Sequence, residues 1–157
     1  MLTTSFTCET PEQTFQLGEF IGHQAPAGEI WRLAGPLGAG KTVFAKGLAK
    51  GLGFEGLVTS PSFTLMHIYE GRFNLYHFDW FRLEKPAEVE DLGWREWTGR
   101  GGVVAVEWGD KFPELFPDTT INLTFEMLGE ESRRLVLEAN HPQTISRVEE
   151  IIRCWPP

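Results

Sequence analysis

Gly35-Pro36-Leu37-Gly38-Ala39-Gly40-Lys41-Thr42 fits the pattern G-x-x-x-x-G-K-[ST], which forms the phosphate-binding loop of nucleoside triphosphatases. Glycines let the backbone turn its N–H groups inward, close enough to bind phosphate oxygens. The lysine of such a loop contacts the β and γ phosphates, and the hydroxyl that follows it binds Mg²⁺. All eight residues are therefore candidate nucleotide contacts, Lys41 is also a candidate catalytic residue, and Thr42 is a candidate metal ligand.

The residues on either side of this loop have the periodicity that the motif requires. Residues 29–34 are typical of a buried strand, and apolar residues recur every four positions from Phe44 to Leu52, as on one face of a helix. We expect that helix to end at Gly51 and Gly53. A strand, a loop and a helix in this order place the phosphates at a helix N-terminus, where the helix dipole favours anions. A chance glycine-rich turn is the alternative, and both flanks argue against it.

The rest of the chain predicts a single α/β domain, a P-loop NTPase-like fold of three layers. Val103 to Val106 is a continuous apolar run, typical of a parallel strand buried on both faces. Alternating patterns elsewhere predict antiparallel hairpins, so the central sheet should be mixed. Further strands are expected at residues 2–7, 121–127 and 135–137, and further helices from Pro11, over residues 86–92 and through Ile145, Val148, Ile151 and Ile152.

A β-hairpin is expected around Glu70-Gly71, with these two residues as its turn. In this register Ser62 faces Asp79, which brings a Ser-Pro-Ser stretch to the acidic end of the second strand. His67 is then several residues away from His77, which argues against a transition-metal site of two histidines and one carboxylate.

Two acidic residues are candidates for the chemistry beside the loop. Mg²⁺ prefers oxygen ligands and takes one or two carboxylates beside the phosphates. Glu107 directly follows the buried run 103–106, at the Walker-B position of P-loop proteins. Asp79 is a candidate for positioning water or for binding the metal. Each has a plain alternative, because Glu107 can end a buried strand with no metal role and Asp79 can be a solvated acid.

Composition limits the functions open to the chain. Its 157 residues carry 14 Lys and Arg against 22 Asp and Glu, a net charge of −8. Nucleic-acid binding relies on basic surface, so we expect at most indirect contact with RNA. Cys8 and Cys154 are expected to be free thiols, with a disulfide as the alternative. No targeting or membrane-spanning segment is visible, which predicts a cytoplasmic protein that does not bind membranes, and we expect a monomer.

Four motifs in order carry a family resemblance. After the phosphate loop come Ser60-Pro61-Ser62-Phe63-Thr64, Tyr76-His77-Phe78-Asp79 with Arg82-Leu83, and Glu107-Trp108. Their order and spacing resemble the TsaE family, also called YjeE, across nearly the whole chain. Proteins of this family are bacterial ATPases needed to make threonylcarbamoyladenosine in tRNA, at the adenosine beside the anticodon. They work with the TsaD–TsaB complex.

The resemblance implies roles for individual residues. It makes Thr42 and Glu107 ligands of Mg²⁺, and Asp79 a hydrolysis residue. It makes the stretch 60–64 a switch-like loop near the γ-phosphate, with Ser60 and Ser62 as nucleotide contacts. The adenine of ATP would lie against the Thr10-Pro11 turn, with Arg133 close by. Pro36 departs from the family pattern, because an acidic residue is common there and proline removes one backbone donor.

Other classes of P-loop protein remain alternatives to a partner-controlled ATPase. A small-molecule kinase would also need an acceptor pocket and usually an arginine-bearing lid, and no such insert is visible in the sequence. A GTPase would show N-K-x-D and D-x-x-G, and neither is present. A nucleotide-dependent binding module that hydrolyses nothing is the third possibility. Arg82 is the only arginine within a few residues of Asp79. If it points away from the phosphates, the site lacks an arginine that stabilises transition-state charge, so we expect slow hydrolysis alone and faster hydrolysis with TsaD–TsaB.

Overall fold

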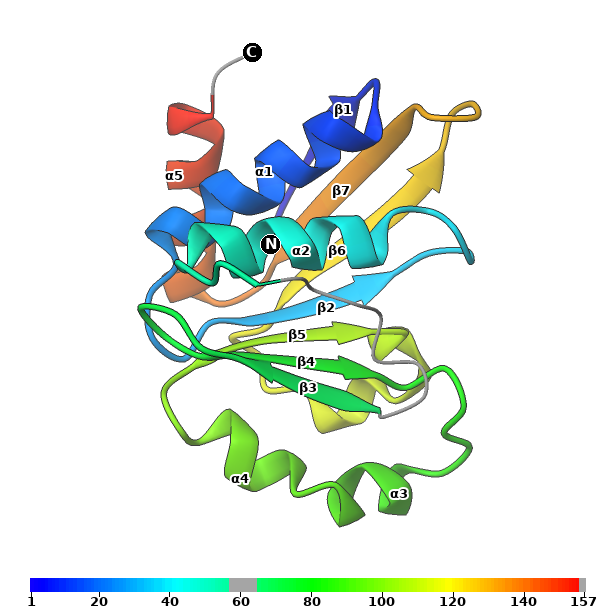
Figure 1. The fold of residues 1–157 in the computed structure, drawn as a ribbon, viewed down its shortest axis with the longest axis vertical. Helices are drawn as coiled ribbons and strands as arrows, with labels where there is room; N and C mark the ends of the chain where they lie inside the picture. The colour runs from blue at the N-terminus through cyan, green and yellow to red at the C-terminus, as the bar shows by residue number, and fades with distance from the viewer. Residues whose placement is uncertain (57–64, 156–157) are drawn as a thin grey trace.

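The strand that leads into the phosphate loop lies at the centre of the molecule. In the computed structural model, which describes residues 1–56 and 65–155, β2 (Ile30–Ala34) is the middle strand of a seven-stranded sheet. The strand order is β1-β7-β6-β2-β5-β4-β3 (Figure 1). β2 pairs in parallel with β5 on one side and with β6 on the other. The sheet is mixed, as the sequence predicts, with a parallel core of β4, β5, β2 and β6.

Antiparallel strands complete the sheet on both sides of this core. β3 pairs with β4, β7 pairs with β6, and β1 pairs with β7 at the far edge. The six strands around β2 are β1 (Leu2–Cys8), β3 (Met66–Tyr69), β4 (Leu75–Asp79), β5 (Val103–Glu107), β6 (Ile121–Met127) and β7 (Arg133–Ala139).

Helices cover the two faces of the sheet unequally. α1 (Pro11–Gln24), α2 (Lys41–Gly51) and α5 (Pro142–Cys154) pack on one face, over a core to which all seven strands contribute (Figure 1). α3 (Pro86–Asp91), α4 (Trp94–Thr98) and the short 3₁₀ helices η1 (Gly109–Lys111) and η2 (Pro113–Leu115) lie over the other face. This second core involves β2, β4 and β5, whereas the outward residues Thr3, Ser5 and Thr7 of β1 are exposed. The three layers are therefore complete over only part of the sheet.

α1 and α2 approach so closely that glycines face the opposite backbone. A Cβ added at Gly18 or Gly22 of α1 would lie 2.4 Å from a carbonyl oxygen of α2. A Cβ at Gly47 or Gly51 of α2 would lie 2.2 or 2.1 Å from a carbonyl oxygen of α1. Each pair is spaced four residues apart, so the glycines line one face of each helix. Gly51 is thus a packing residue at the end of α2. Gly53, which follows the C-cap Leu52, has a φ of 98° in the left-handed region.

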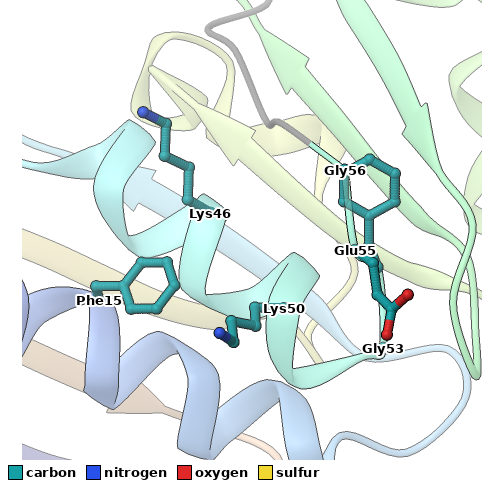
Figure 2. A pocket seen from close by; sticks show the side chains of 7 residues that line it. Phe15, Lys46, Lys50, Gly53, Glu55 and Gly56 are labelled. Atoms are coloured by element: carbon teal, nitrogen blue, oxygen red, sulfur yellow. The ribbon is translucent and has the colours of Figure 1, made fainter.

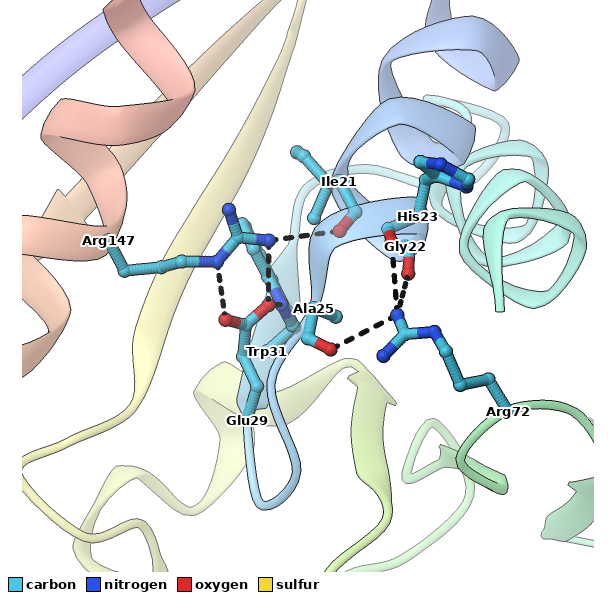
Figure 3. Close-up of polar contacts among 8 residues, drawn as sticks. All are labelled: Ile21, Gly22, His23, Ala25, Glu29, Trp31, Arg72 and Arg147. Atoms are coloured by element: carbon cyan, nitrogen blue, oxygen red, sulfur yellow. Dashed lines mark hydrogen bonds and ion pairs between the residues drawn. The ribbon is translucent and has the colours of Figure 1, made fainter. Parts of the chain in front are cut away.

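The hairpin expected around Glu70-Gly71 has a different register. His67 faces His77, and Tyr69 faces Leu75, so residues 70–74 form a longer connection than a two-residue turn. The reason is that this connection is tied to the helices. Arg72 N–H donates to Leu52 O at 2.5 Å, and the Arg72 guanidinium donates to three carbonyls at the end of α1 (Figure 3). The expected facing of Ser62 and Asp79 involves a residue outside the described part of the chain.

A buried ion pair fixes the C-terminal helix to the start of β2. Arg147 of α5 donates through Nε to Glu29 Oε2 at 2.7 Å, and Trp31 Nε1 donates to the other carboxylate oxygen (Figure 3). Arg147 also donates to Ile21 O of α1 at 2.9 Å. Burial raises the pKa of Glu29, while the Arg147 guanidinium opposes that rise.

Most of the predicted elements are confirmed, with two smaller corrections. α4 was not expected, and it begins directly after Gly93, whose φ is 82°. Ile152 does not belong to the inner face of the last helix, because it is 41% exposed. The two cysteines are free, as expected, with Cys8 buried and Cys154 exposed. Within residues 1–56 and 65–155, no helix combines the length and the hydropathy needed to cross a lipid bilayer.

Candidate functional site

The phosphate loop joins the C-terminal end of β2 to the N-terminus of α2. Three glycines of the loop have positive φ, which residues with a side chain rarely adopt: 144° at Gly35, 79° at Gly38 and 107° at Gly40. Gly40 is the N-cap of α2 and supplies no side chain there, so the first N–H groups of the helix stay open to a ligand. The loop therefore has the backbone that an anion site at a helix N-terminus requires.

Lys41 is buried at the mouth of this loop. Its ammonium donates to Gly35 O at 2.5 Å and to Pro36 O at 2.9 Å, and it lies 4.1 Å from the centre of the Trp108 ring. An ammonium has three donors, so one remains beyond these two bonds. Burial lowers the pKa of Lys41, while the carboxylates of Glu107, Asp110 and Asp79 oppose that shift.

Thr42 and Glu107 are in direct contact, although 65 residues separate them in the sequence. The Thr42 hydroxyl lies 3.0 Å from both carboxylate oxygens of Glu107. His77, which is fully buried on β4, places Nε2 at 2.7 Å from Glu107 Oε2. Because a carboxylate oxygen accepts, the imidazole donates through Nε2. The two predicted metal ligands thus meet, and His77 holds one of them.

Asp79 lies next to Glu107, in register on the neighbouring strand. Both side chains are almost fully buried. Asp79 Oδ1 accepts from Phe81 N–H at 2.8 Å, which orients the carboxylate at the end of β4. A cavity of about 230 Å³ is lined by loop residues 37–42 together with Asp79 and Glu107. The structure therefore brings Lys41, Thr42, Asp79 and Glu107 to one cavity.

The oxygen atoms of this cavity fit Mg²⁺. Thr42 and Glu107 supply a hydroxyl and a carboxylate within hydrogen-bonding distance of each other, and Asp79 supplies a second carboxylate nearby. Mg²⁺ uses few protein ligands, because it keeps several waters and takes the remaining oxygens from phosphates. In the described part of the chain, no three His, Cys, Asp or Glu residues form a metal site of their own. This donor set favours a phosphate-bound magnesium over an all-protein metal centre.

The predicted adenine contacts lie on another side of the loop. Pro11 and Arg133 line a small cavity of about 70 Å³ together with Thr14 and loop residues 38–40. Thr10 caps α1, and its hydroxyl accepts from Gln13 N–H at 3.2 Å. Ser60 and Ser62, like the whole stretch 60–64, lie outside the described residues.

Two residues that the sequence did not assign to the site belong to it. His77 shares one strand face with Asp79, a pattern visible in the sequence, but its contact with Glu107 depends on the pairing of β4 and β5. Phe81 lines the cavity, and its ring lies 4.9 Å from that of Trp108. Trp108 itself has φ of 61°, so the backbone turns sharply just after Glu107.

A larger cavity of about 460 Å³ lies away from the loop. Figure 2 shows its lining by Phe15 of α1, Lys46 and Lys50 of α2, and Glu55 beyond the end of α2. The sequence predicts Lys46 and Lys50 as a solvated pair on the polar face of the helix. The described residues that line this cavity include one carboxylate, that of Glu55, and no phosphate-loop backbone, so the phosphate loop is the better candidate site.

Comparison with known sequences identifies one family. A sequence model of the family described as "Threonylcarbamoyl adenosine biosynthesis protein TsaE" matches residues 8–135. Proteins named "tRNA threonylcarbamoyladenosine biosynthesis protein TsaE" from Treponema pallidum (strain Nichols) and Bacillus subtilis (strain 168) are 36% and 38% identical to this chain, over 126 and 130 residues. The alignments cover 80% and 82% of this chain, and 93% and 81% of those proteins.

A solved structure agrees with the sequence matches. The crystal structure of Bacillus subtilis YdiB has a TM-score of 0.84 and 29% sequence identity to this chain, over 97% of this chain and 95% of that one. The similarity thus extends over the sheet, the helices and the phosphate loop alike. The chain belongs to the TsaE family, whose role is in the biosynthesis of threonylcarbamoyladenosine in tRNA.

Proposed function

We propose that this protein binds ATP with Mg²⁺ at the phosphate loop and hydrolyses it during threonylcarbamoyladenosine synthesis, acting with the TsaD–TsaB complex. The observation that carries the proposal is the contact of Thr42 with Glu107 at the N-terminus of α2, at 3.0 Å. It brings a hydroxyl and a buried carboxylate together where a P-loop protein binds the metal of its nucleotide.

Each residue of the cavity has a distinct part in this proposal. The loop N–H groups and the Lys41 ammonium bind the phosphates, while Thr42 and Glu107 hold Mg²⁺. The metal, when bound, neutralises charge that develops on the phosphates during transfer. Asp79 orients the attacking water, since its carboxylate is fixed by Phe81 N–H beside Glu107. His77 fixes the direction in which the Glu107 carboxylate points.

The absence of a nearby arginine favours control by a partner. Among the described residues, no arginine lines the cavity that holds Lys41, Asp79 and Glu107. An arginine that stabilises transition-state charge raises the turnover of such sites by about 10³- to 10⁵-fold. We therefore expect this protein alone to hydrolyse ATP slowly, at about 10⁻⁴ to 10⁻² s⁻¹.

Steady-state phosphate release at fixed ATP and Mg²⁺, across a titration of TsaD–TsaB, tests this function. Stimulated release that is lost in Lys41→Ala supports a partner-controlled ATPase. A flat titration with demonstrated binding indicates a nucleotide-dependent binding module. Phosphate transferred to a small molecule instead of water indicates a kinase. Release that Lys41→Ala does not change would contradict the assignment of the loop.

A further inference from the structure

Arg133, the first residue of β7, is bonded entirely to backbone carbonyls. Its Nε donates to Ala39 O at 3.0 Å, and its Nη2 donates to Gly38 O at 3.3 Å, both in the phosphate loop. The remaining bonds go to the turn between β6 and β7, at Gly129 O, Glu130 O and Ser132 O, over 2.9 to 3.1 Å. A guanidinium has five N–H donors, and here five carbonyls accept from it.

This saturation changes the role expected for Arg133. A hydrogen bond to a nucleotide base or phosphate would need a free guanidinium donor, and the five donors already have carbonyl acceptors. We propose that Arg133 is a positioning residue, which ties the phosphate loop to the β6–β7 turn and so fixes the direction of the loop peptides. This inference rests on the proposed function, because it concerns how the loop is prepared for phosphates.

The peptide between Ala39 and Gly40 shows why such a tie matters. In a trans peptide the C=O and N–H point in opposite directions. Holding Ala39 O against Arg133 therefore aims Gly40 N–H to the opposite side, and that N–H has no backbone acceptor among the described residues. Gly40 has φ of 107°, and glycine tolerates either sign of φ, so this peptide has little intrinsic resistance to flipping. The bond to Arg133 supplies that resistance.

The geometry requires arginine specifically. The planar guanidinium reaches the loop with Nε and Nη2 and the turn with its other donors, whereas a lysine ammonium is a single point with three donors. Arg133→Lys therefore keeps the charge but loses part of the tie. The next residue, Arg134, is a matched control, because it is exposed and pairs with Glu126 at 3.3 Å.

The test compares Arg133→Lys, Arg133→Gln and the control Arg134→Gln by calorimetry, with two ligands in the presence of Mg²⁺. One ligand is ATP, and the other is inorganic tripolyphosphate, which has no base. We expect both Arg133 variants to weaken the binding of both ligands by a similar factor, about tenfold or more, and Arg134→Gln to change neither. Loss of ATP affinity alone would overturn the proposal, because it would indicate a contact with the base. Unchanged affinity for both ligands, or equal losses in Arg134→Gln, would also overturn it.

Hydrogen exchange of the ligand-free protein tests the same inference independently of nucleotide binding. Peptides that span residues 35–40 should exchange faster in Arg133→Lys than in the parent protein, while the core strand β5 should not. If the parent protein binds neither ligand, the proposed function fails, yet the exchange result still decides whether Arg133 holds the loop. Equal exchange in parent and variant would overturn the proposal that Arg133 holds the loop, whatever the binding data show.

Discussion

The carboxylate of Glu107 is held by two partners within the protein, the hydroxyl of Thr42 and the imidazole of His77. A buried carboxylate is costly unless it is hydrogen-bonded, and these two contacts supply its oxygen atoms with partners. If Glu107 holds Mg²⁺ as proposed, the metal would take the place of its bond to Thr42, and the bond to His77 would remain. His77 thus has the position of the outer partners that orient metal ligands in other proteins.

Replacing His77 should change the Mg²⁺ dependence of ATP binding. His77→Phe removes the donor to Glu107 while keeping a ring in the core, so we expect the Mg²⁺ concentration for half-maximal ATP binding to rise by about tenfold. ATP affinity in the presence of EDTA should stay unchanged. Calorimetric titrations at several Mg²⁺ concentrations measure both. His67→Phe is the control, because His67 contacts the Tyr69 hydroxyl and not Glu107. An unchanged Mg²⁺ dependence in His77→Phe would assign His77 to packing alone.

Asp79 should matter more for hydrolysis than for binding. Asp79→Asn keeps an oxygen that can accept from Phe81 N–H but loses the negative charge, so in the proposed mechanism the attacking water would lose the group that orients it. We expect ATP turnover to fall by about 100-fold, with a much smaller change in ATP affinity. Single-turnover phosphate release and calorimetry on the same preparation separate the two effects. Equal losses of turnover and affinity would show that Asp79 serves mainly to bind the nucleotide complex.

At the scale of elements, α1 and α2 depend on contact between their backbones. Glycines on both helices remove the side chains that would otherwise keep the axes apart. The sequence shows these glycines, but their spacing alone does not reveal which helix they face. Only the pairing of the two helices explains Gly18, Gly22 and Gly47.

Adding one methyl group at this interface should destabilise the protein. In Gly47→Ala the new Cβ would meet the Phe15 carbonyl oxygen at 2.2 Å, so the helices must move apart. We expect the free energy of unfolding to fall by about 1 to 3 kcal/mol, as for other overpacked cores. Urea unfolding followed by circular dichroism measures it. Gly129→Ala is the matched control, because no atom lies within 4 Å of its added Cβ. Equal stability of the two variants would mean that the helices adapt without strain.

Local patterns predicted some elements and contacts well and others poorly. The phosphate loop, β2, β5 and the β6–β7 pair were predictable because their signals lie within short segments. The register of β3 and β4 was not, since it depends on Arg72 binding carbonyls of α1 some fifty residues away. The family resemblance implied that Arg133 lies close to the adenine, and no local pattern could show that its guanidinium donors all reach backbone carbonyls.

At the scale of the whole molecule, the reactivity of the two cysteine thiols depends on whether the protein is folded. Burial raises the pKa of Cys8, and a hydrogen bond with Thr14 only partly opposes the shift, so little thiolate forms there at pH 8. Cys154 is exposed near the end of α5. We expect one thiol to react quickly with Ellman's reagent in the native protein and the second only after unfolding. Cys154→Ser should abolish the fast reaction. Two fast thiols in the native protein would contradict the burial of Cys8.

β2 carries the phosphate loop near the start of the chain, yet it pairs with strands that begin at residues 103 and 121. During translation the loop therefore leaves the ribosome well before either neighbouring strand exists. Contacts between such distant residues close long stretches of chain and form slowly. Arg133, which ties the loop, is translated later still. The phosphate loop is thus synthesised before Asp79, Glu107 and Arg133, and the candidate site is complete only after these later residues have been added and packed against it.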